Sequence, residues 1–217
     1  VSSPEASITA VQPAVVCGSQ APKAVTISGD GFAPLPINSL ADTPALELPK
    51  LFLTQRTLAD GSVGTAAELQ VYDGADQNHV RWSSAAQMSF DVYPGMRVSD
   101  PTTGAAGSDL EPGLYDVSVQ NPDGRRARMD SGLAVVPPPQ LKSAVPNPAC
   151  TAQGDVTYTL TGTNFIQIGA QLPQVSFTDV SSQALVQTVT ASTASGCVSL
   201  PAPTGLTLQS CTTLVVT

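Results

Sequence analysis

The sequence has few charged and few aromatic side chains. Only 12% of its residues are Asp, Glu, Lys or Arg and 5% are aromatic, whereas about 25% of residues are charged in typical soluble domains. Basic residues are the scarcest: nine Lys and Arg stand against seventeen Asp and Glu, which gives a net charge of −8. Because a surface that follows phosphates needs clustered Lys and Arg, this balance argues against nucleic acid as a partner.

Long apolar runs are also missing. No stretch approaches the roughly 18 apolar residues that a membrane-spanning helix needs, so we expect no membrane span in this segment. The sequence opens with VSSPEAS, without an initiator Met or a signal peptide. Such a start is typical of a processed or engineered fragment whose targeting information is missing.

Catalytic motifs are absent as well. The sequence has one histidine, His79, and contains no G-x-S-x-G, G-x-x-x-x-G-K or H-E-x-x-H pattern. His79 follows an Asp- and Asn-rich turn, which favours a solvent-exposed turn histidine. A hydrolase would need a pocket with polar groups around His79 or paired acids. We therefore predict that the protein is not an enzyme.

What the sequence does contain is an internal repeat. Residues 8–32 (ITAVQPAVVCGSQAPKAVTISGDGF) match residues 141–165 (LKSAVPNPACTAQGDVTYTLTGTNF) without a gap, at an offset of 133 positions. The matched pairs are Pro13 and Pro146, Cys17 and Cys150, Gln20 and Gln153, Thr26 and Thr159, Gly29 and Gly162, and Phe32 and Phe165. A repeat of this kind predicts two copies of one structural unit.

The composition predicts that these units are all-β. Nineteen Pro and seventeen Gly, with abundant Thr, Ser and Val, disfavour helices and favour short strands. Alternating apolar residues predict strands at 25–28, 51–58, 68–72, 80–83, 88–93 and 156–161. We expect turns at 29–31 and 162–164, where Gly and Asn tolerate positive φ, and a Pro-rich loop at 34–49.

The clearest local pattern is PGLYDVSVQNPDG at residues 112–124. Tyr115, Val117 and Val119 alternate with polar residues, and the residues 121–124 are those that a hairpin turn requires. Tyr115 begins its strand, where β-sandwich domains often carry a tyrosine whose hydroxyl bonds to the backbone. Three arginines follow (Arg125, Arg126 and Arg128), and we interpret them as a solvated hairpin tip.

The ordered set of motifs resembles the IPT/TIG family of immunoglobulin-like domains. The resemblance rests on the strand leading to Pro13, on VTISGDGF (25–32) and on PGLYDVSVQNPDG, with LKSAVPNP (141–148) and YTLTGTNF (158–165) in the second copy. It implies two tandem immunoglobulin-like β-sandwiches, at residues 1–136 and 141–217, joined by a Pro-rich linker at 137–140. Such domains occur in bacterial surface proteins, receptors, Rel-type transcription factors and glycan-degrading enzymes.

The second copy departs from this pattern, since it has no counterpart of the 112–124 hairpin. Residues 211–217 align best with 88–93, so the second sandwich is expected to be truncated. One explanation is that the chain is a fragment of a longer array of repeats. The other is that a neighbouring chain supplies the missing strands, because an unpaired strand edge is a template for pairing.

Four cysteines allow three pairings. Cys197 and Cys211 flank a short loop and are natural partners, and Cys17 and Cys150 would pair with each other or with cysteines outside the fragment. Disulfides and an acidic, hydroxyl-rich chain favour an extracytoplasmic location: cell surface, periplasm or secreted. The alternative is that all four are buried thiols.

Two further features are candidate ligand sites. Asp73, Asp76 and Asn78 gather oxygen ligands in one turn, as a Ca²⁺ site requires, although any tight turn recruits the same residues. Trp82, with Tyr72 or Tyr93 beside it, would form a platform that stacks on a sugar if it were exposed, and would be a core residue if it were not.

These observations favour an adhesion or protein-interaction module that also acts as a spacer. The alternative is a carbohydrate-binding accessory module of a glycan-processing or uptake system. The expected partners are a protein or a glycan at a cell surface, and no cofactor is expected apart from the Ca²⁺ just described.

Overall fold

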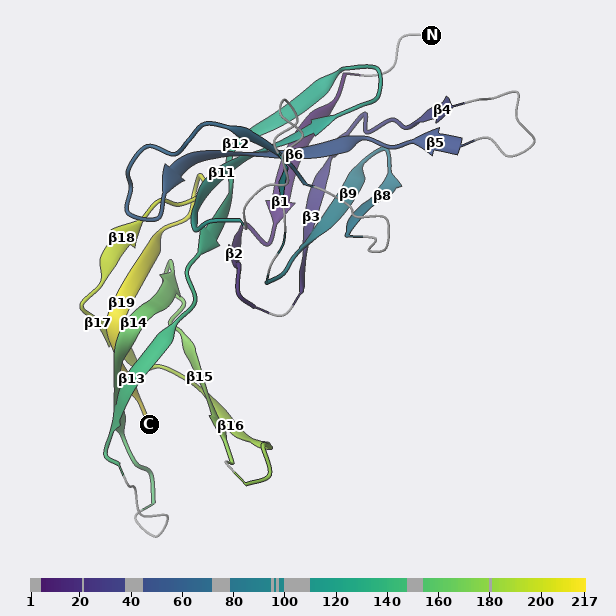
Figure 1. Ribbon diagram of the computed structural model, residues 1–217. Coiled ribbons are helices and arrows are strands. Elements are labelled where there is room, and N and C mark those ends of the chain that lie inside the picture. The colour runs from purple at the N-terminus through teal and green to yellow at the C-terminus, as the bar shows by residue number, and fades with distance from the viewer. Residues whose placement is uncertain are drawn as a thin grey trace. The chain divides into compact units, whose positions relative to one another are not determined.

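The computed structural model describes residues 5–20, 22–37, 45–71, 79–94, 96, 98–99, 110–147, 154–179 and 181–217. These residues form β-strands, turns and irregular segments but no helix, so the chain is all-β and none of the described segments is a membrane-spanning helix. The chain divides into two compact units (Figure 1). The first comprises Val1–Pro137 and Pro201–Thr204, and the second Pro138–Leu200 and Gly205–Thr217.

The first unit contains two main sheets. One has the order β1 (Ser7–Gln12), β3 (Lys23–Asp30), β9 (Gln87–Val92), β8 (Val80–Ser84). The other has the order β10 (Val98–Ser99), β7 (Glu68–Val71), β6 (Lys50–Leu58), β11 (Gly113–Gln120), β12 (Arg126–Val136), β2 (Val15–Cys17). All pairings are antiparallel except that of β2 with β12.

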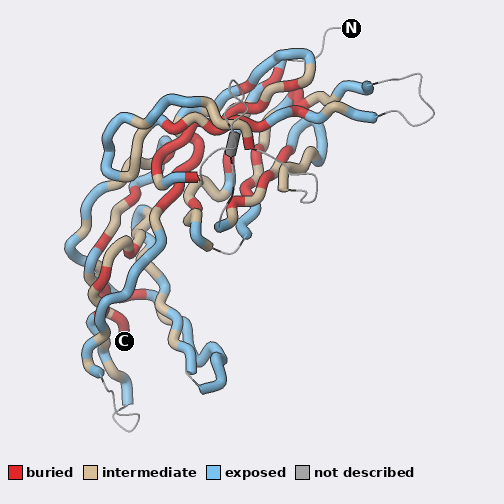
Figure 2. The backbone as a smooth tube through the Cα atoms, in the orientation of Figure 1, coloured by how far each residue is buried: buried red, intermediate tan, exposed pale blue. Residues whose placement is uncertain are grey.

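The two sheets pack face to face around one apolar core (Figure 2). Val25 and Phe90 from the first sheet and Leu53, Val117 and Val119 from the second are fully buried in it. Because alternate residues of a strand point to opposite faces, apolar residues at every second position bury one face of each sheet. The first unit is therefore a two-layer β-sandwich.

The second unit has one complete sheet and one hairpin. Its larger sheet has the order β13 (Gln140–Val145), β14 (Tyr158–Ile168), β19 (Leu208–Val216), β17 (Thr193–Ser195), with β18 (Val198–Leu200) also paired to β19. The hairpin consists of β15 (Gln174–Thr178) and β16 (Leu185–Thr190). Its core comprises Leu160, Phe165, Ala191, Cys211, Leu214 and Val216.

The repeat is visible in the backbone as well as in the sequence. The peptide bonds before Pro13 and Pro146 are both cis. β1 shifts register against β3 between Ile8 and Ala10, and β13 shifts register against β14 at the matching position, between Leu141 and Ser143. β3 and β14, and likewise β9 and β19, therefore hold equivalent places in the two units.

Two local predictions were wrong in part. Gly29 and Gly162 lie inside β3 and β14 and do not begin turns; the positive φ occurs two residues later, at Gly31 (73°) and Asn164 (60°). The segment 34–49, expected to be a loop, contains the paired strands β4 (Leu35–Ile37) and β5 (Ala45–Glu47). Pro36 is tolerated there because β4 pairs on one side only.

The repeated Gly-x-x-Phe pattern has a packing cause. A Cβ placed on Gly29 would lie 2.0 Å from the carbonyl oxygen of Ser7 and 2.6 Å from Cζ of Phe32. On Gly162 it would lie 2.0 Å from the carbonyl oxygen of Gln140 and 2.7 Å from Cζ of Phe165. Only glycine lets the neighbouring strand and the aromatic ring approach the backbone this closely.

The predicted hairpin forms, with β11 and β12 joined by a turn closed by the N–H of Gly124 to the carbonyl of Asn121 (2.9 Å). The hydroxyl of Tyr115 donates to the carbonyl oxygen of Glu111 (2.6 Å), as expected, and accepts from Nε2 of Gln55 (3.2 Å). Burial raises the pKa of Tyr115 strongly, so the phenol stays protonated.

Candidate functional site

The calcium-site residues Asp73, Asp76 and Asn78 lie outside the described residues, as does Tyr72 of the proposed sugar platform. Within the described ranges, no cluster of three or more His, Cys, Asp or Glu is placed to hold a metal ion. The prediction of a Ca²⁺ site at this turn therefore stays a prediction.

Trp82 lies on β8 and packs against the core of the first unit. Its indole N–H donates to the carbonyl oxygen of Phe32 (2.9 Å), and its strand partner is the buried Met88. Tyr93 is also half-buried against this core. The structure thus places both aromatics against the sandwich interior, which favours the core interpretation of Trp82 over the sugar platform.

His79 is not the exposed turn residue that we expected. Its ring stacks on Tyr93 with centroids 4.3 Å apart, and Nδ1 lies 3.3 Å from Oδ2 of Asp91. Arg81 also bonds the Asp91 carboxylate. The hydrogen bond from Arg81 is the main cause that holds the pKa of Asp91 below its usual value. These contacts hold the chain around β8 against the chain around β9, so His79 and Arg81 have a structural role there.

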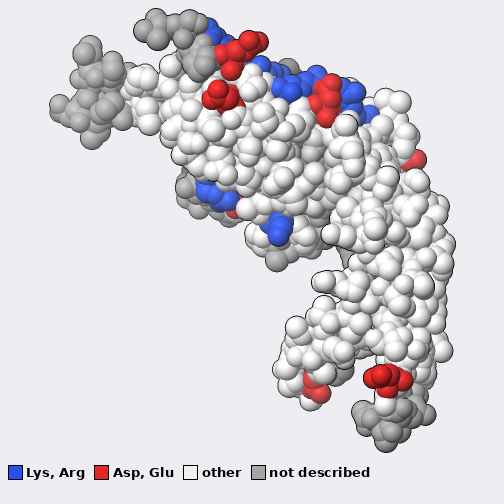
Figure 3. All heavy atoms as spheres, turned by 180° about the vertical axis from the view of Figure 1, so that it is seen from behind, with Lys and Arg blue, Asp and Glu red and all other residues white. Residues whose placement is uncertain are grey.

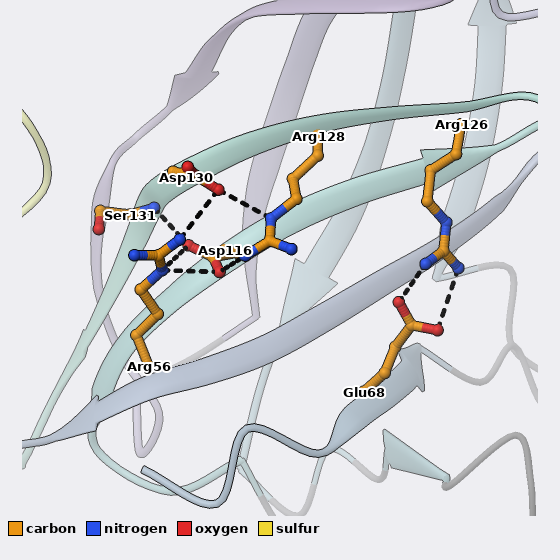
Figure 4. A network of polar contacts seen from close by, with 7 residues as sticks. All are labelled: Arg56, Glu68, Asp116, Arg126, Arg128, Asp130 and Ser131. Carbon is orange, nitrogen blue, oxygen red and sulfur yellow. Dashed lines mark hydrogen bonds and ion pairs between the residues drawn. The ribbon is translucent and has the colours of Figure 1, made fainter. Parts of the chain in front are cut away.

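The arginines after the hairpin turn pair with carboxylates along the outer face of the six-stranded sheet (Figure 4). Nε of Arg56 donates to both carboxylate oxygens of Asp116 (2.8 Å each), and Arg128 binds the same group. Arg126 bonds Glu68 and lies 4.6 Å from the ring centre of Phe52. The expectation of a solvated tip therefore needs correction for Arg126 and Arg128, which are held in ion pairs.

Asp116 is buried although its position in β11 alternates outward. Its side chain is 1% exposed and accepts the backbone N–H of Ser131 (2.6 Å), a residue with φ of +52° at a register shift in β12. Burial by itself raises the pKa of Asp116, but the hydrogen bonds from Arg56 and Ser131 and the charge of Arg128 outweigh it, so the pKa is lowered. The Asp116 carboxylate therefore holds the backbone of β12 in place at the register shift around Ser131.

We expect Asp116→Asn to destabilise the first unit by about 2 kcal/mol at pH 7, because charge-assisted hydrogen bonds to a buried group are lost. A lowered folded-state pKa stabilises the fold above the unfolded pKa, near 4, and this contribution disappears as the pH falls through the folded pKa. Urea unfolding followed by Trp82 fluorescence at pH 7, 4 and 2.5 should therefore show the difference from wild type shrinking with acid.

Asp130→Asn is the matched control, since Asp130 binds the same arginines with a side chain that is 65% exposed. An exposed ion pair of this kind contributes less than about 1 kcal/mol. An Asp116→Asn difference no larger than the control, or one that persists at pH 2.5, would contradict the role given to Asp116.

The predicted disulfide between Cys197 and Cys211 is present. Val198 of β18 pairs with Ser210 of β19, so the two cysteines lie directly opposite each other and link these strands. Cys17 carries a free thiol, and Cys150 lies outside the described residues. The pairing of Cys150 stays a prediction.

An open cleft lies within the second unit, between the hairpin β15–β16 and the end of the larger sheet. Its volume is about 490 Å³. Tyr158 and Phe177 contribute two aromatic rings whose centres are 5.5 Å apart. The lining residues are Gly154, Asp155, Val156, Tyr158, Phe177, Val186, Gln187, Val189, Val216 and Thr217.

The walls of this cleft carry almost no charge. Between Pro138 and Thr217 the sequence has only three charged residues, Lys142, Asp155 and Asp179, and the second unit is accordingly almost entirely white in Figure 3. Val186 is 68% exposed at the rim of the cleft. A partly apolar cleft whose only charged lining residue is Asp155 fits an uncharged or apolar group better than an anion.

Sequence reasoning missed Tyr158 and Phe177, although the repeat held a signal for one of them. Tyr158 occupies the position of Val25, which is fully buried in the first unit, whereas Tyr158 is only half-buried. A larger, amphipathic side chain at an otherwise equivalent core position indicates a different environment. The position of Phe177 opposite it depends on the fold of the β15–β16 hairpin.

The structure thus defines an all-β protein with a β-sandwich unit and a second, related unit. No family model matches the sequence, and no curated protein matches it either. Among solved structures the chain is similar to the titin domains Z1Z2 in complex with telethonin, at 13% identity and a TM-score of 0.29, over 100% of this chain and 83% of that one. A similarity this low says nothing about function.

Proposed function

We propose that the protein is a non-enzymatic adhesion or protein-interaction module of the extracytoplasmic space, which also acts as a spacer. We further propose that both units are immunoglobulin-like sandwiches of the IPT/TIG type. The observation that carries the function is the cleft of the second unit, which has paired Tyr158 and Phe177 and a single charged lining residue, Asp155. The disulfide between Cys197 and Cys211 is compatible with an oxidising compartment.

Carbohydrate binding is the second candidate. Two aromatic rings beside Asp155, Gln187 and Thr217 combine stacking surfaces with hydrogen-bonding groups, which is what a sugar requires. We therefore propose Tyr158 and Phe177 as the sugar-stacking residues, because Trp82 packs on the core of the first unit.

Arrays of purified extracellular proteins and of glycans, probed with and without Ca²⁺, separate these functions. We expect saturable binding to protein that a chelator does not change and that weakens at least tenfold in Val186→Ser. Val63→Ser is the matched control, since Val63 is an exposed apolar residue (85%) of the first unit.

Glycan binding that falls in Tyr158→Ala would establish the carbohydrate candidate instead. Glycan binding that is lost only in Trp82→Ala would support the original hypothesis that a sugar stacks on Trp82 of β8. Dependence on Ca²⁺ would locate a metal site at the turn containing Asp73, and binding to neither array would contradict both functions.

A further inference from the structure

The larger sheet of the second unit has one face on the core and one face turned away from it. Cross-strand pairing places one residue from each of four strands in a single row: Ala144, Leu160, Leu214 and Ala194. All four belong to the core of this unit or pack against it. Because alternate residues of a strand point to opposite sides, the rows before and after this one lie on the other side of the sheet, which we call the outer face.

The outer face carries two complete rows of short side chains. One row crosses β13, β14, β19 and β17 as Val145, Thr159, Val215 and Thr193, and the other crosses them as Ser143, Thr161, Thr213 and Ser195. Val145 is 61% exposed, and the other seven residues are exposed or half-buried. None of the eight is charged or aromatic. The second unit thus presents an uncharged, mostly β-branched face to solvent.

The first unit provides an internal comparison, since its four-stranded sheet contains the same rows. The core row there comprises Val11, Ile27, Met88 and Trp82. The two rows on the opposite side comprise Gln12, Thr26, Ser89 and Arg81, and Ala10, Ser28, Gln87 and Ser84. Where the first unit has Gln12 and Arg81, the second has Val145 and Thr193. The long or charged side chains of the first outer face are therefore short and uncharged in the second.

Two properties reduce the free energy needed to bury this outer face. The hydroxyls of Ser143 and Thr161 bond each other across β13 and β14 (2.5 Å), so burial leaves neither of them without a hydrogen-bond partner. Val and Thr side chains have few rotamers, so ordering them in an interface loses little conformational entropy.

We propose that two copies of the chain associate through this outer face, each presenting the same residues to the other around a two-fold axis. Such an isologous contact brings like residues near one another, so a charged face would repel its copy, whereas an uncharged face does not. Two copies of one sheet also have the same twist, which lets them pack face to face with their strands about 30° apart. Because each copy uses its only such face in the pair, association stops at a dimer.

The composition of the outer face argues against other occupants. Interfaces between different proteins are enriched in Tyr, Trp, Met and Arg, and sugars stack on aromatic rings. The eight residues of the outer face include none of these types. Tyr158 and Val216, which line the cleft, precede Thr159 and follow Val215, so they lie on the opposite side of the sheet. The dimer therefore goes beyond the proposed function and uses a different surface.

Sedimentation velocity of the whole chain over a range of concentrations tests the dimer. We expect a mass that rises from that of one chain to that of two. Thr159→Lys, which places like charges on the two facing copies, should raise the dissociation constant about tenfold or more. Thr26→Lys is the matched control, because Thr26 holds the same place in the first unit, and it should leave the dissociation constant unchanged.

A mixed sample guards against misfolding of the variant. Thr159→Asp should also weaken the association of the chain with itself. An equimolar mixture of Thr159→Lys and Thr159→Asp should associate more tightly than either variant alone, because opposite charges then face each other. A misfolded variant could not regain association in this way.

Other outcomes would overturn the dimer. A mass of one chain at every concentration would do so, as would a dimer that Thr159→Lys leaves intact, an equal loss in Thr26→Lys, or a mixture that associates no more tightly than its parts. Assemblies that keep growing beyond two chains would assign the association to strand edges and not to this face. Binding on the protein and glycan arrays is measured independently, so the dimer and the proposed function can fail separately.

Discussion

Gly29→Ala should destabilise the first unit by about 3–4 kcal/mol, and this is the largest single effect that we expect. The added Cβ would lie 2.0 Å from the carbonyl oxygen of Ser7, a backbone atom that cannot move without separating β1 from β3. It would also meet the ring of Phe32. Thermal unfolding followed by fluorescence of Trp82, the single tryptophan of the chain, should show a midpoint lower by roughly 10 °C.

Gly18→Ala is the matched control in the same unit. A Cβ there meets Cγ1 of Val135 at 3.5 Å and the carbonyl oxygen of Leu110 at 3.6 Å, which are ordinary contacts. We expect a change of less than about 1 kcal/mol. Equal effects of the two substitutions would show that the close approach at Gly29 is not a constraint on the fold.

Removal of the disulfide should have the second largest effect. The bond closes a sequence separation of 14 residues, so its loss in the double variant Cys197→Ala and Cys211→Ala should destabilise the second unit by about 3 kcal/mol. The buried core of this unit is small, and Cys211 is part of it. Hydrogen exchange measured by mass spectrometry should show loss of protection in β14 and β19.

Cys17→Ala controls for the loss of a thiol without the loss of a bond, since Cys17 is free. Trp82 fluorescence reports on the first unit in the same sample. Unchanged protection of β14 and β19 in the double variant would show that packing alone maintains the second unit.

Strand order along the sequence was largely predictable, because strand residues alternate with period two and turns need particular residues. The strands containing Leu53, Val80 and Phe90 lie where the alternation of apolar residues placed them. The NPDG turn and the Tyr115 hydroxyl bond to Glu111 also follow from local chemistry.

Packing between strands was not predictable in the same way. Gly29 and Gly162 were expected to begin turns, because glycine tolerates the positive φ that many turns require. Their true role depends on a carbonyl of another strand, more than twenty residues away. The alternation in β11 placed Asp116 among the polar residues opposite Tyr115 and Val117, but its burial depends on Arg56 and Arg128 from neighbouring strands.

The sequence by itself determined that this protein is all-β, internally repeated and nearly free of charge after Pro137, because composition and period are local properties. It also predicted Cys197 and Cys211 as disulfide partners, and the structure confirms this pair. Only the tertiary structure decided that Val145, Thr159 and Val215 lie in one row and that Tyr158 meets Phe177 over an open cleft. Pairing and burial are set by which strands meet in space, and spacing along the chain does not encode that.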